Sequence, residues 1–154
     1  MIVTQQEKLF FTEEGFLVIE PLLTKEEVQF YSEIYNDFLN NKFDVAELRS
    51  DLSGANDQST ELITQIMLPS KVYPNLLNQP MHKKASEIAK FLMGDDMVLD
   101  FDMLINKPPN SNKETPWHQD AAYWIDLPDK RALSLWFAID ESTLNNGCMW
   151  YTPK

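Results

Sequence analysis

The segment TPWHQDAAYW, at residues 115–124, contains a histidine and an aspartate separated by one residue. In an extended chain alternate side chains project to the same side, so His118 and Asp120 are expected to face one point. An imidazole and a carboxylate are two of the three ligands in the facial triad that holds Fe(II) and leaves positions open for oxygen and a co-substrate. The spacing is compatible with a metal-binding pair but is weak evidence by itself, and the surrounding sequence strengthens it. A surface ion pair is the alternative, because three-residue patterns recur by chance.

A second imidazole for such a triad is not evident in the sequence. The one other histidine is His82, which lies beside Lys83 and Lys84 in the first turn of a helical pattern. A histidine in that position is expected to face solvent. We therefore expect either that the triad is completed outside this chain or that this chain does not hold iron properly.

The sequence on both sides of the pair predicts β-strands. Before it, residues 97–105 alternate apolar with other side chains, as a half-buried strand does, and the prolines at 108 and 109 end the pattern. The alternating apolar set is Met97, Leu99, Phe101, Met103 and Ile105. Asp100 and Asp102 are expected on the exposed face of that strand.

After the pair, residues 132–139 predict another strand. An acidic and polar turn follows, in which Asn145-Asn146-Gly147 predicts a hairpin reversal, and residues 148–152 predict the returning strand. Strand, proline-bounded loop, histidine–aspartate pair, strand, turn and strand therefore follow one another in a defined order.

This order resembles the phytanoyl-CoA dioxygenase family of Fe(II)- and 2-oxoglutarate-dependent oxygenases. The resemblance rests on the linked segments MLINKPP (103–109), WHQD (117–120) and NNGCM (145–149). At the N-terminus, EGFLVIEPLL (14–23) followed by TKEEV (24–28) resembles the family's opening strand and helix. The resemblance covers nearly the whole chain and is weakest from residue 40 to residue 60.

The resemblance implies an α+β fold, built on a cupin-like double-stranded β-helix or jelly roll with flanking helices and iron at its open mouth. A jelly roll needs about eight strands, and the sequence predicts roughly four or five. We expect residues 1–154 to be a single domain, the incomplete N-terminal part of such a barrel. The family's distal His and its 2-oxoglutarate-binding Arg would lie further downstream, since neither Arg49 nor Arg131 matches that Arg. Alone, these residues are expected to be inactive.

The resemblance also assigns the site. His118 and Asp120 match the family's Fe(II) ligands. The residues that match the 2-oxoglutarate pocket are Met103, Gln119 and Trp136, with Gln65 as an upstream polar residue that reaches the co-substrate. The implied activity is an O2-consuming hydroxylation of a small organic substrate, because related halogenases replace the carboxylate at Asp120 with a small residue. The alternative is a non-catalytic jelly-roll module for binding or assembly, without iron.

Two helices are predicted. Thr24 and Glu27 form a capping-box pattern at the start of the first, whose apolar side chains then fall on one face. These are Val28, Tyr31, Tyr35, Phe38 and Leu39. The second helix is expected from about Pro80 to a stop at Gly94. Residues 40–60 are expected to form an irregular polar excursion, either a solvated loop or a substrate lid.

The composition is that of one soluble domain. The 154 residues are 44% apolar, enough for a single core. A formal net charge of -11 disfavours nucleic acid and anionic membranes as partners. The N-terminus lacks an apolar signal region, and the single Cys148 suits a reducing compartment. We therefore expect a cytoplasmic protein. The aromatic residues near the pair could line a substrate pocket, but aromatic side chains in strands are more often in the core, and only Trp136 gains a pocket role from the resemblance. These residues are Trp117, Tyr123, Trp124, Trp136 and Trp150.

Overall fold

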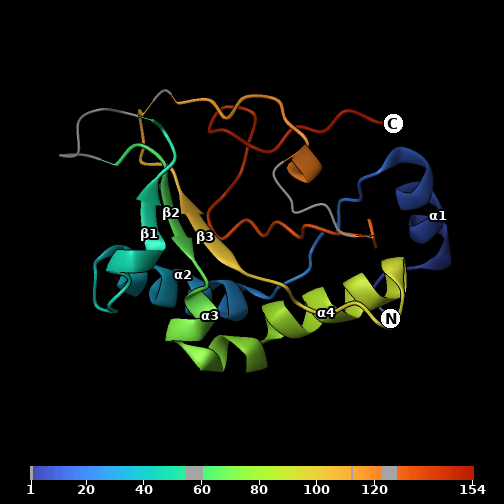
Figure 1. Cartoon of the computed structure of the whole chain (residues 1–154), viewed down its shortest axis with the longest axis horizontal. Helices are drawn as coiled ribbons and strands as arrows, with labels where there is room; N and C mark the ends of the chain where they lie inside the picture. Colours follow the sequence, from blue (N-terminus) through green and yellow to red (C-terminus); the bar gives the residue numbers. More distant parts are fainter. Residues whose placement is uncertain (1, 55–60, 112, 123–127) are drawn as a thin grey trace.

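The computed structural model describes residues 2–54, 61–111, 113–122 and 128–154. Helices lie beside a small antiparallel sheet (Figure 1), so the α+β class is confirmed. The helices are α1 (Gln5–Glu14), α2 (Lys25–Leu39), α3 (Pro69–Val72) and α4 (Pro80–Met93), with short 3-10 turns η1 (Ala46–Leu48), η2 (Pro74–Asn78) and η3 (Asp120–Ala122). The strands, in sheet order, are β1 (Arg49–Asp51), β2 (Thr64–Met67) and β3 (Met103–Asn106).

Helix α2 begins as its sequence predicts. The Thr24 hydroxyl accepts a hydrogen bond from the Glu27 amide at 3.2 Å, and the Glu27 carboxylate accepts one from the Thr24 amide at 2.9 Å. These two bonds satisfy amides that the first helical turn leaves without partners. Tyr31 and Phe38 on the predicted apolar face are fully buried, so this helix and its inward face are confirmed.

Helix α4 also has the predicted limits, with Pro80 in its first turn and Gly94 beyond its last residue at a φ of +129°. Its first turn is joined to α2, because the buried Tyr31 hydroxyl accepts a hydrogen bond from the Met81 amide at 2.8 Å. A second link is the ion pair between Lys84 and Glu27, at 2.9 Å. The two helices therefore form one packed unit.

Replacing Tyr31 with Phe should lower the free energy of unfolding by roughly 2 kcal/mol, because the buried Met81 amide then loses its acceptor. Urea denaturation followed by circular dichroism measures this change. Tyr73→Phe is the matched control, since the Tyr73 hydroxyl has no hydrogen bond among the described residues. Equal midpoints for the two variants would contradict the role of the Tyr31 hydroxyl.

The segment at residues 40–60 was expected to be irregular, and this is wrong for the part that forms β1. Arg49 opens β1 and makes a bidentate contact with the Glu61 carboxylate, at 2.8–3.1 Å. Asp51 closes β1 and accepts hydrogen bonds from the amides of Ser53, Leu62 and Ile63. These bonds hold the pKa of Asp51 down, at about 2. Polar side chains at both ends of β1 thus stabilise this strand pair. Residues 55–60 of the expected loop lie outside the described residues.

Strand β3 faces the core with the opposite set of side chains from the one expected. Leu104 is 3% exposed, whereas Met103 and Ile105 are 38% and 48% exposed. Leu104 pairs in register with the buried Ile66 of β2, and both belong to the core cluster that contains Tyr31 and Phe38 of α2. Packing against α2 therefore fixes which side of the sheet is covered. The strand is also shorter than residues 97–105.

His82 and Asp102 were expected on the surface, and this is wrong, because both side chains are largely buried. His82 Nε2 lies 3.0 Å from Asp102 Oδ2, and the two side chains are 10% and 13% exposed. The Asp102 carboxylate also accepts hydrogen bonds from the Ser70 hydroxyl and amide, at 2.9 and 3.2 Å. Asp102 thus joins α3, α4 and the chain entering β3, because it lies on the same covered side as Leu104.

The predicted strands at residues 132–139 and 148–152 are not paired into a sheet. Residues 132–139 still alternate, with half-buried side chains facing the helices and exposed ones facing away. Leu133 and Leu135 pack on the cluster of Val3, Ile88 and Leu92, and Phe137 and Ile139 pack on the larger core cluster. Three strands are assigned within the described ranges, and the eight-stranded barrel stays a prediction.

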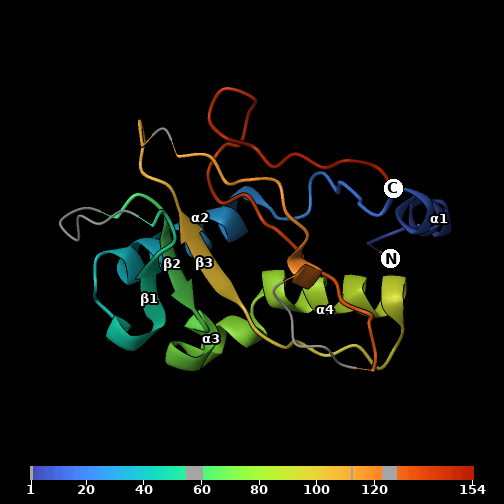
Figure 2. The same cartoon turned by 45° about the horizontal axis from the view of Figure 1, so that its top comes forward.

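The chain reversal after residue 143 is confirmed. The Asn146 and Cys148 amides donate to the Thr143 carbonyl, and Gly147 has a φ of +91° that favours glycine. At the other end, the strand expected within residues 14–23 is absent from the structure of these residues; helix α1, which was not predicted, ends at Glu14. The C-terminal segment ends beside α1 (Figure 2), where the Lys154 amide donates to the Glu14 carbonyl. None of the helices in the described ranges has the length and apolar character needed to cross a membrane.

Candidate functional site

His118 and Asp120 lie close together, although the chain between them is not fully extended. Asp120 opens η3, and the Ala122 amide donates to the Gln119 carbonyl at 3.0 Å. The distance from His118 Nε2 to Asp120 Oδ1 is 3.5 Å. The tight turn after Gln119 therefore keeps both side chains on one side of the segment, as the extended geometry would have done.

The orientation of the His118 ring is set by the backbone. Its Nδ1 lies 2.7 Å from the Pro116 carbonyl oxygen, which can only accept, so Nδ1 carries the proton and donates it. In the neutral ring Nε2 then presents a lone pair, and Nε2 is the nitrogen nearest to Asp120. Histidines that bind metals commonly donate their other ring N–H to a carbonyl in this way.

The Asp120 carboxylate is held by a residue that the sequence did not suggest. The Ser134 hydroxyl donates to Asp120 Oδ2 at 2.7 Å, which leaves Oδ1 on the side of His118. The charge of Asp120 also reaches Tyr151, whose pKa is raised mainly by burial and further by this carboxylate. The His118 and Asp120 side chains remain 37% and 47% exposed.

These donor atoms suit a divalent metal in type and spacing. Two neighbouring ligands of an octahedral metal, each about 2.1 Å from it, lie roughly 3 Å apart, and the pair is 3.5 Å apart without one. Within the described ranges, no group of three or more His, Cys, Asp or Glu side chains could hold a metal ion. This region therefore offers two candidate donor side chains, and a three-ligand metal site would need a third from elsewhere.

Gln65 and Met103 are brought together on the open face of the sheet. Gln65 Nε2 donates to the Met103 sulfur at 3.3 Å and to the Met67 sulfur at 3.1 Å. Thioether sulfur is a weak acceptor, so this amide can exchange its partners for a better one at small cost. Gln119 and Trp136 are both exposed, and Trp136 shares its outward side with Ser134 through the alternation of residues 132–139.

The aromatic residues expected in the core are mostly on the surface. Trp117 and Trp150 are exposed, and so is Trp136, which the resemblance assigned to the co-substrate pocket. Tyr123 and Trp124 lie outside the described residues. Tyr151 contacts the N-terminal region, where its ring stacks on that of Phe16 with 5.6 Å between the ring centroids.

Both arginines form ion pairs with carboxylates. Arg49 binds Glu61 with a closest contact of 2.8 Å, and Arg131 binds Asp96 and Asp129, each with a closest contact of 2.6 Å. Neither guanidinium group contacts His118 or Asp120 in the interactions that the described residues make. The positive partner that a dicarboxylate co-substrate needs is therefore not one of these two side chains.

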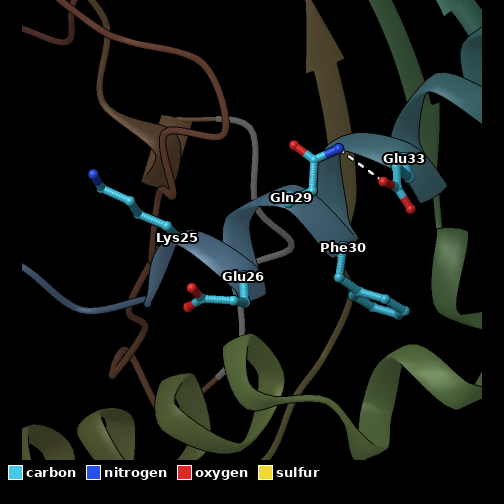
Figure 3. A pocket seen from close by; sticks show the side chains of 5 residues that line it. All are labelled: Lys25, Glu26, Gln29, Phe30 and Glu33. Atoms are coloured by element: carbon cyan, nitrogen blue, oxygen red, sulfur yellow. Dashed lines mark hydrogen bonds between the residues drawn. The ribbon is translucent and has the colours of Figure 1, made fainter.

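Two hollows on the surface of the described residues are lined by side chains other than those of the candidate site. Figure 3 shows one on α2, lined by Lys25, Glu26, Gln29, Phe30 and Glu33, with Phe30 pointing toward the neighbouring helices. Another surrounds the Arg49–Glu61 ion pair and is lined also by Leu39, Asn41, Thr64, Asn106 and Pro108. Neither of these two hollows is lined by His118, Asp120 or the residues assigned to the co-substrate.

Comparison with known proteins shows which family this sequence resembles. The family model described as phytanoyl-CoA dioxygenase (PhyH) matches residues 11–154. The peroxisomal phytanoyl-CoA dioxygenase of Bos taurus is 26% identical over 160 residues, which cover 99% of this chain and 47% of that protein. The ectoine dioxygenase of Sphingopyxis alaskensis is 28% identical over 156 residues, covering 98% of this chain and 49% of that protein.

The chain thus spans about half the length of these curated relatives. A shorter match, 41% identical over 51 residues, is to phytanoyl-CoA dioxygenase domain-containing protein 1 of Bos taurus. No solved structure matches the chain. Because the family model covers nearly the whole sequence, this chain belongs to the phytanoyl-CoA dioxygenase family.

Proposed function

We propose that His118 and Asp120 bind Fe(II) in a 2-oxoglutarate-dependent dioxygenase that hydroxylates a small organic substrate. The observation that carries the proposal is the oriented pair: Pro116 fixes the proton on Nδ1 of His118, and Nε2 faces Asp120 Oδ1 at 3.5 Å. Family membership supports the dioxygenase class. Two relatives are named for oxygenation of phytanoyl-CoA and of ectoine, which supports a small-molecule substrate.

The residues of this chain would position the bound iron and co-substrate and balance their charge, while these cofactors supply the oxidation. Bound iron and 2-oxoglutarate would use O2 to release succinate and CO2 and to oxidise a substrate C–H bond. Asp120 offers a negative oxygen donor and His118 a neutral nitrogen donor, a set that suits Fe(II) and leaves other positions for the co-substrate and oxygen. Asp120 also occupies the position a halide would need, which favours hydroxylation.

A third ligand and a cationic partner for 2-oxoglutarate are needed as well. We propose that a second histidine and an arginine from outside these 154 residues complete the site, in an intact protein whose remaining strands close the jelly roll. The 154 residues alone are then expected to form no succinate above a no-enzyme control. Two protein ligands would hold iron weakly, and the far carboxylate would lack a charged hydrogen bond of roughly 1.5–3 kcal/mol.

The co-substrate would contact Gln65, Met103, Gln119 and Trp136. Gln65 is the most specific of these assignments, because its amide N–H groups now face two sulfur atoms and would gain by meeting a carboxylate. Gln65→Leu in the intact protein should raise the KM for 2-oxoglutarate by roughly 10-fold, about 1.4 kcal/mol. The affinity for Fe(II), measured by anaerobic calorimetry, should stay unchanged. A rise in the Fe(II) dissociation constant without a change in KM would contradict the assignment.

The activity itself is tested by following succinate formation from 2-oxoglutarate under air, with and without added Fe(II). Iron-dependent succinate formation by the intact protein is the expected result. If that protein binds neither Fe(II) nor 2-oxoglutarate, the proposal fails and the non-catalytic module is favoured. Substrate screening by mass gain of one oxygen atom then identifies the class of molecule that is hydroxylated.

A further inference from the structure

We propose that Ser134 is a positioning residue that makes Asp120 bind the metal through one oxygen only. This inference rests on the proposed function, since it concerns how the same carboxylate meets Fe(II). Its basis is the 2.7 Å hydrogen bond from the Ser134 hydroxyl to Asp120 Oδ2, formed between residues 14 positions apart in the sequence. The other oxygen, Oδ1, is the one that lies 3.5 Å from His118 Nε2.

The need for such a bond follows from the exposure of Asp120. A carboxylate that is about half exposed, at 47%, rotates readily about its last side-chain bond and exchanges its two oxygens. A hydroxyl that donates to one oxygen fixes this rotation and withdraws charge from that oxygen. Oδ1 then remains the better donor and already points toward the histidine.

The position of Ser134 is fixed by its neighbours. Leu133 and Leu135 are both half-buried against the cluster of Val3, Ile88 and Leu92, which includes two residues of α4. Because side chains alternate along this segment, Ser134 between them points outward, where it meets Asp120. The packing on α4 therefore sets where the hydroxyl donor stands, and the donor sets the orientation of the carboxylate.

Single-oxygen binding has a chemical consequence. A facial triad fills three of the six positions of an octahedral metal and leaves three for a chelating co-substrate and oxygen. A carboxylate that binds through both oxygens would fill a fourth position and compete with one of these. The Ser134 hydrogen bond to Oδ2 disfavours binding of the metal through both oxygens. It would therefore keep metal positions open for the co-substrate and oxygen, in addition to raising the affinity for the metal.

Co(II) is the probe, because its visible absorption bands gain intensity when the number of ligands falls and shift when a ligand changes. The experiment titrates Co(II) and, separately under anaerobic conditions, Fe(II) into the intact protein. The variants are Ser134→Ala, Ser134→Thr, Asp120→Ala and Ser142→Ala. Ser142 is an exposed serine of the same C-terminal segment and serves as the matched control. Thermal unfolding of each metal-free protein is recorded in parallel.

Ser134→Ala should weaken metal binding about 10-fold, at the lower end of the 10- to 100-fold typical of residues that hold a ligand. It should also change the Co(II) spectrum, while Ser134→Thr, which keeps the hydroxyl, retains the wild-type affinity and spectrum. Metal-free unfolding temperatures should be equal. The inference is overturned if Ser134→Ala matches Ser142→Ala in affinity and spectrum, or if Ala and Thr weaken binding alike together with a lower unfolding temperature.

The proposed function has its own readout in this experiment. If the wild-type protein binds metal and Asp120→Ala does not, the metal site stands, and the two Ser134 variants alone decide the inference. If the wild-type protein and Asp120→Ala bind metal equally weakly, the metal site fails, and the inference is overturned with it.

Discussion

Asp120→Ala should lower iron- and 2-oxoglutarate-dependent succinate formation by the intact protein by more than roughly 100-fold, beyond the loss expected for residues that only support a ligand. The substitution removes the one negative donor of the pair and leaves His118 as the single ligand from this region. It also frees the Ser134 hydroxyl, which then turns to water. Succinate quantified by mass spectrometry, with Fe(II) affinity measured anaerobically, checks both consequences.

Asp100→Ala is the matched control, because Asp100 is an exposed aspartate in the chain that leads into β3. This control should retain full activity. Asp120→Asn adds a second comparison, since it keeps an oxygen acceptor for Ser134 but loses the negative charge, and it should be nearly as inactive as Asp120→Ala. An Asp120→Ala protein with undiminished succinate formation would refute the ligand assignment.

The helices could be read from the sequence because their signals are local. The Thr24–Glu27 capping box and the Pro80 and Gly94 boundaries lie within a few residues of what they control. Helix α1 carries the same signal, since Thr4 and Glu7 form a complete capping box. It was missed because its apolar periodicity is weak, and no α1 side chain is buried.

The sheet was harder to predict because its register depends on distant partners. Within residues 97–105 both faces of the expected strand carry apolar side chains. The sequence alone therefore cannot say which face the core covers. Ile66 and Tyr31, far away in the chain, settle this by packing with Leu104. The polar segment that contains β1 gave no strand pattern, because its pairing rests on Arg49 and Asp51 side chains rather than on apolar alternation.

Much of the candidate site was accessible from sequence, since the spacing of His118 and Asp120 alone places their side chains together. The proximity of Gln65 and Met103 was anticipated only through the family resemblance, because they are 38 residues apart. Ser134 was not anticipated at all. Its one available signal was its place between Leu133 and Leu135 in an alternating segment, which makes it face outward with Trp136.

Asp102→Ala should produce the largest loss of stability at a polar position, roughly 3 kcal/mol. The carboxylate accepts three hydrogen bonds, two from Ser70 and one from His82 Nε2. Each buried donor left without an acceptor costs roughly 1–3 kcal/mol, and neighbouring losses are not fully additive. Chemical denaturation of the purified protein measures the change.

The comparison with Asp100→Ala isolates burial as the cause, because the two aspartates are two positions apart and the sequence pattern treats them alike. Asp100 is exposed, so its removal should change stability by less than about 0.5 kcal/mol. Asp102→Asn should fall between the two, because its amide oxygen still accepts while its amide nitrogen meets donors. Equal stability of Asp102→Ala and Asp100→Ala would mean that the bonds joining α3, α4 and β3 through Asp102 contribute nothing, and the covered side of β3 would then depend on Leu104 packing alone.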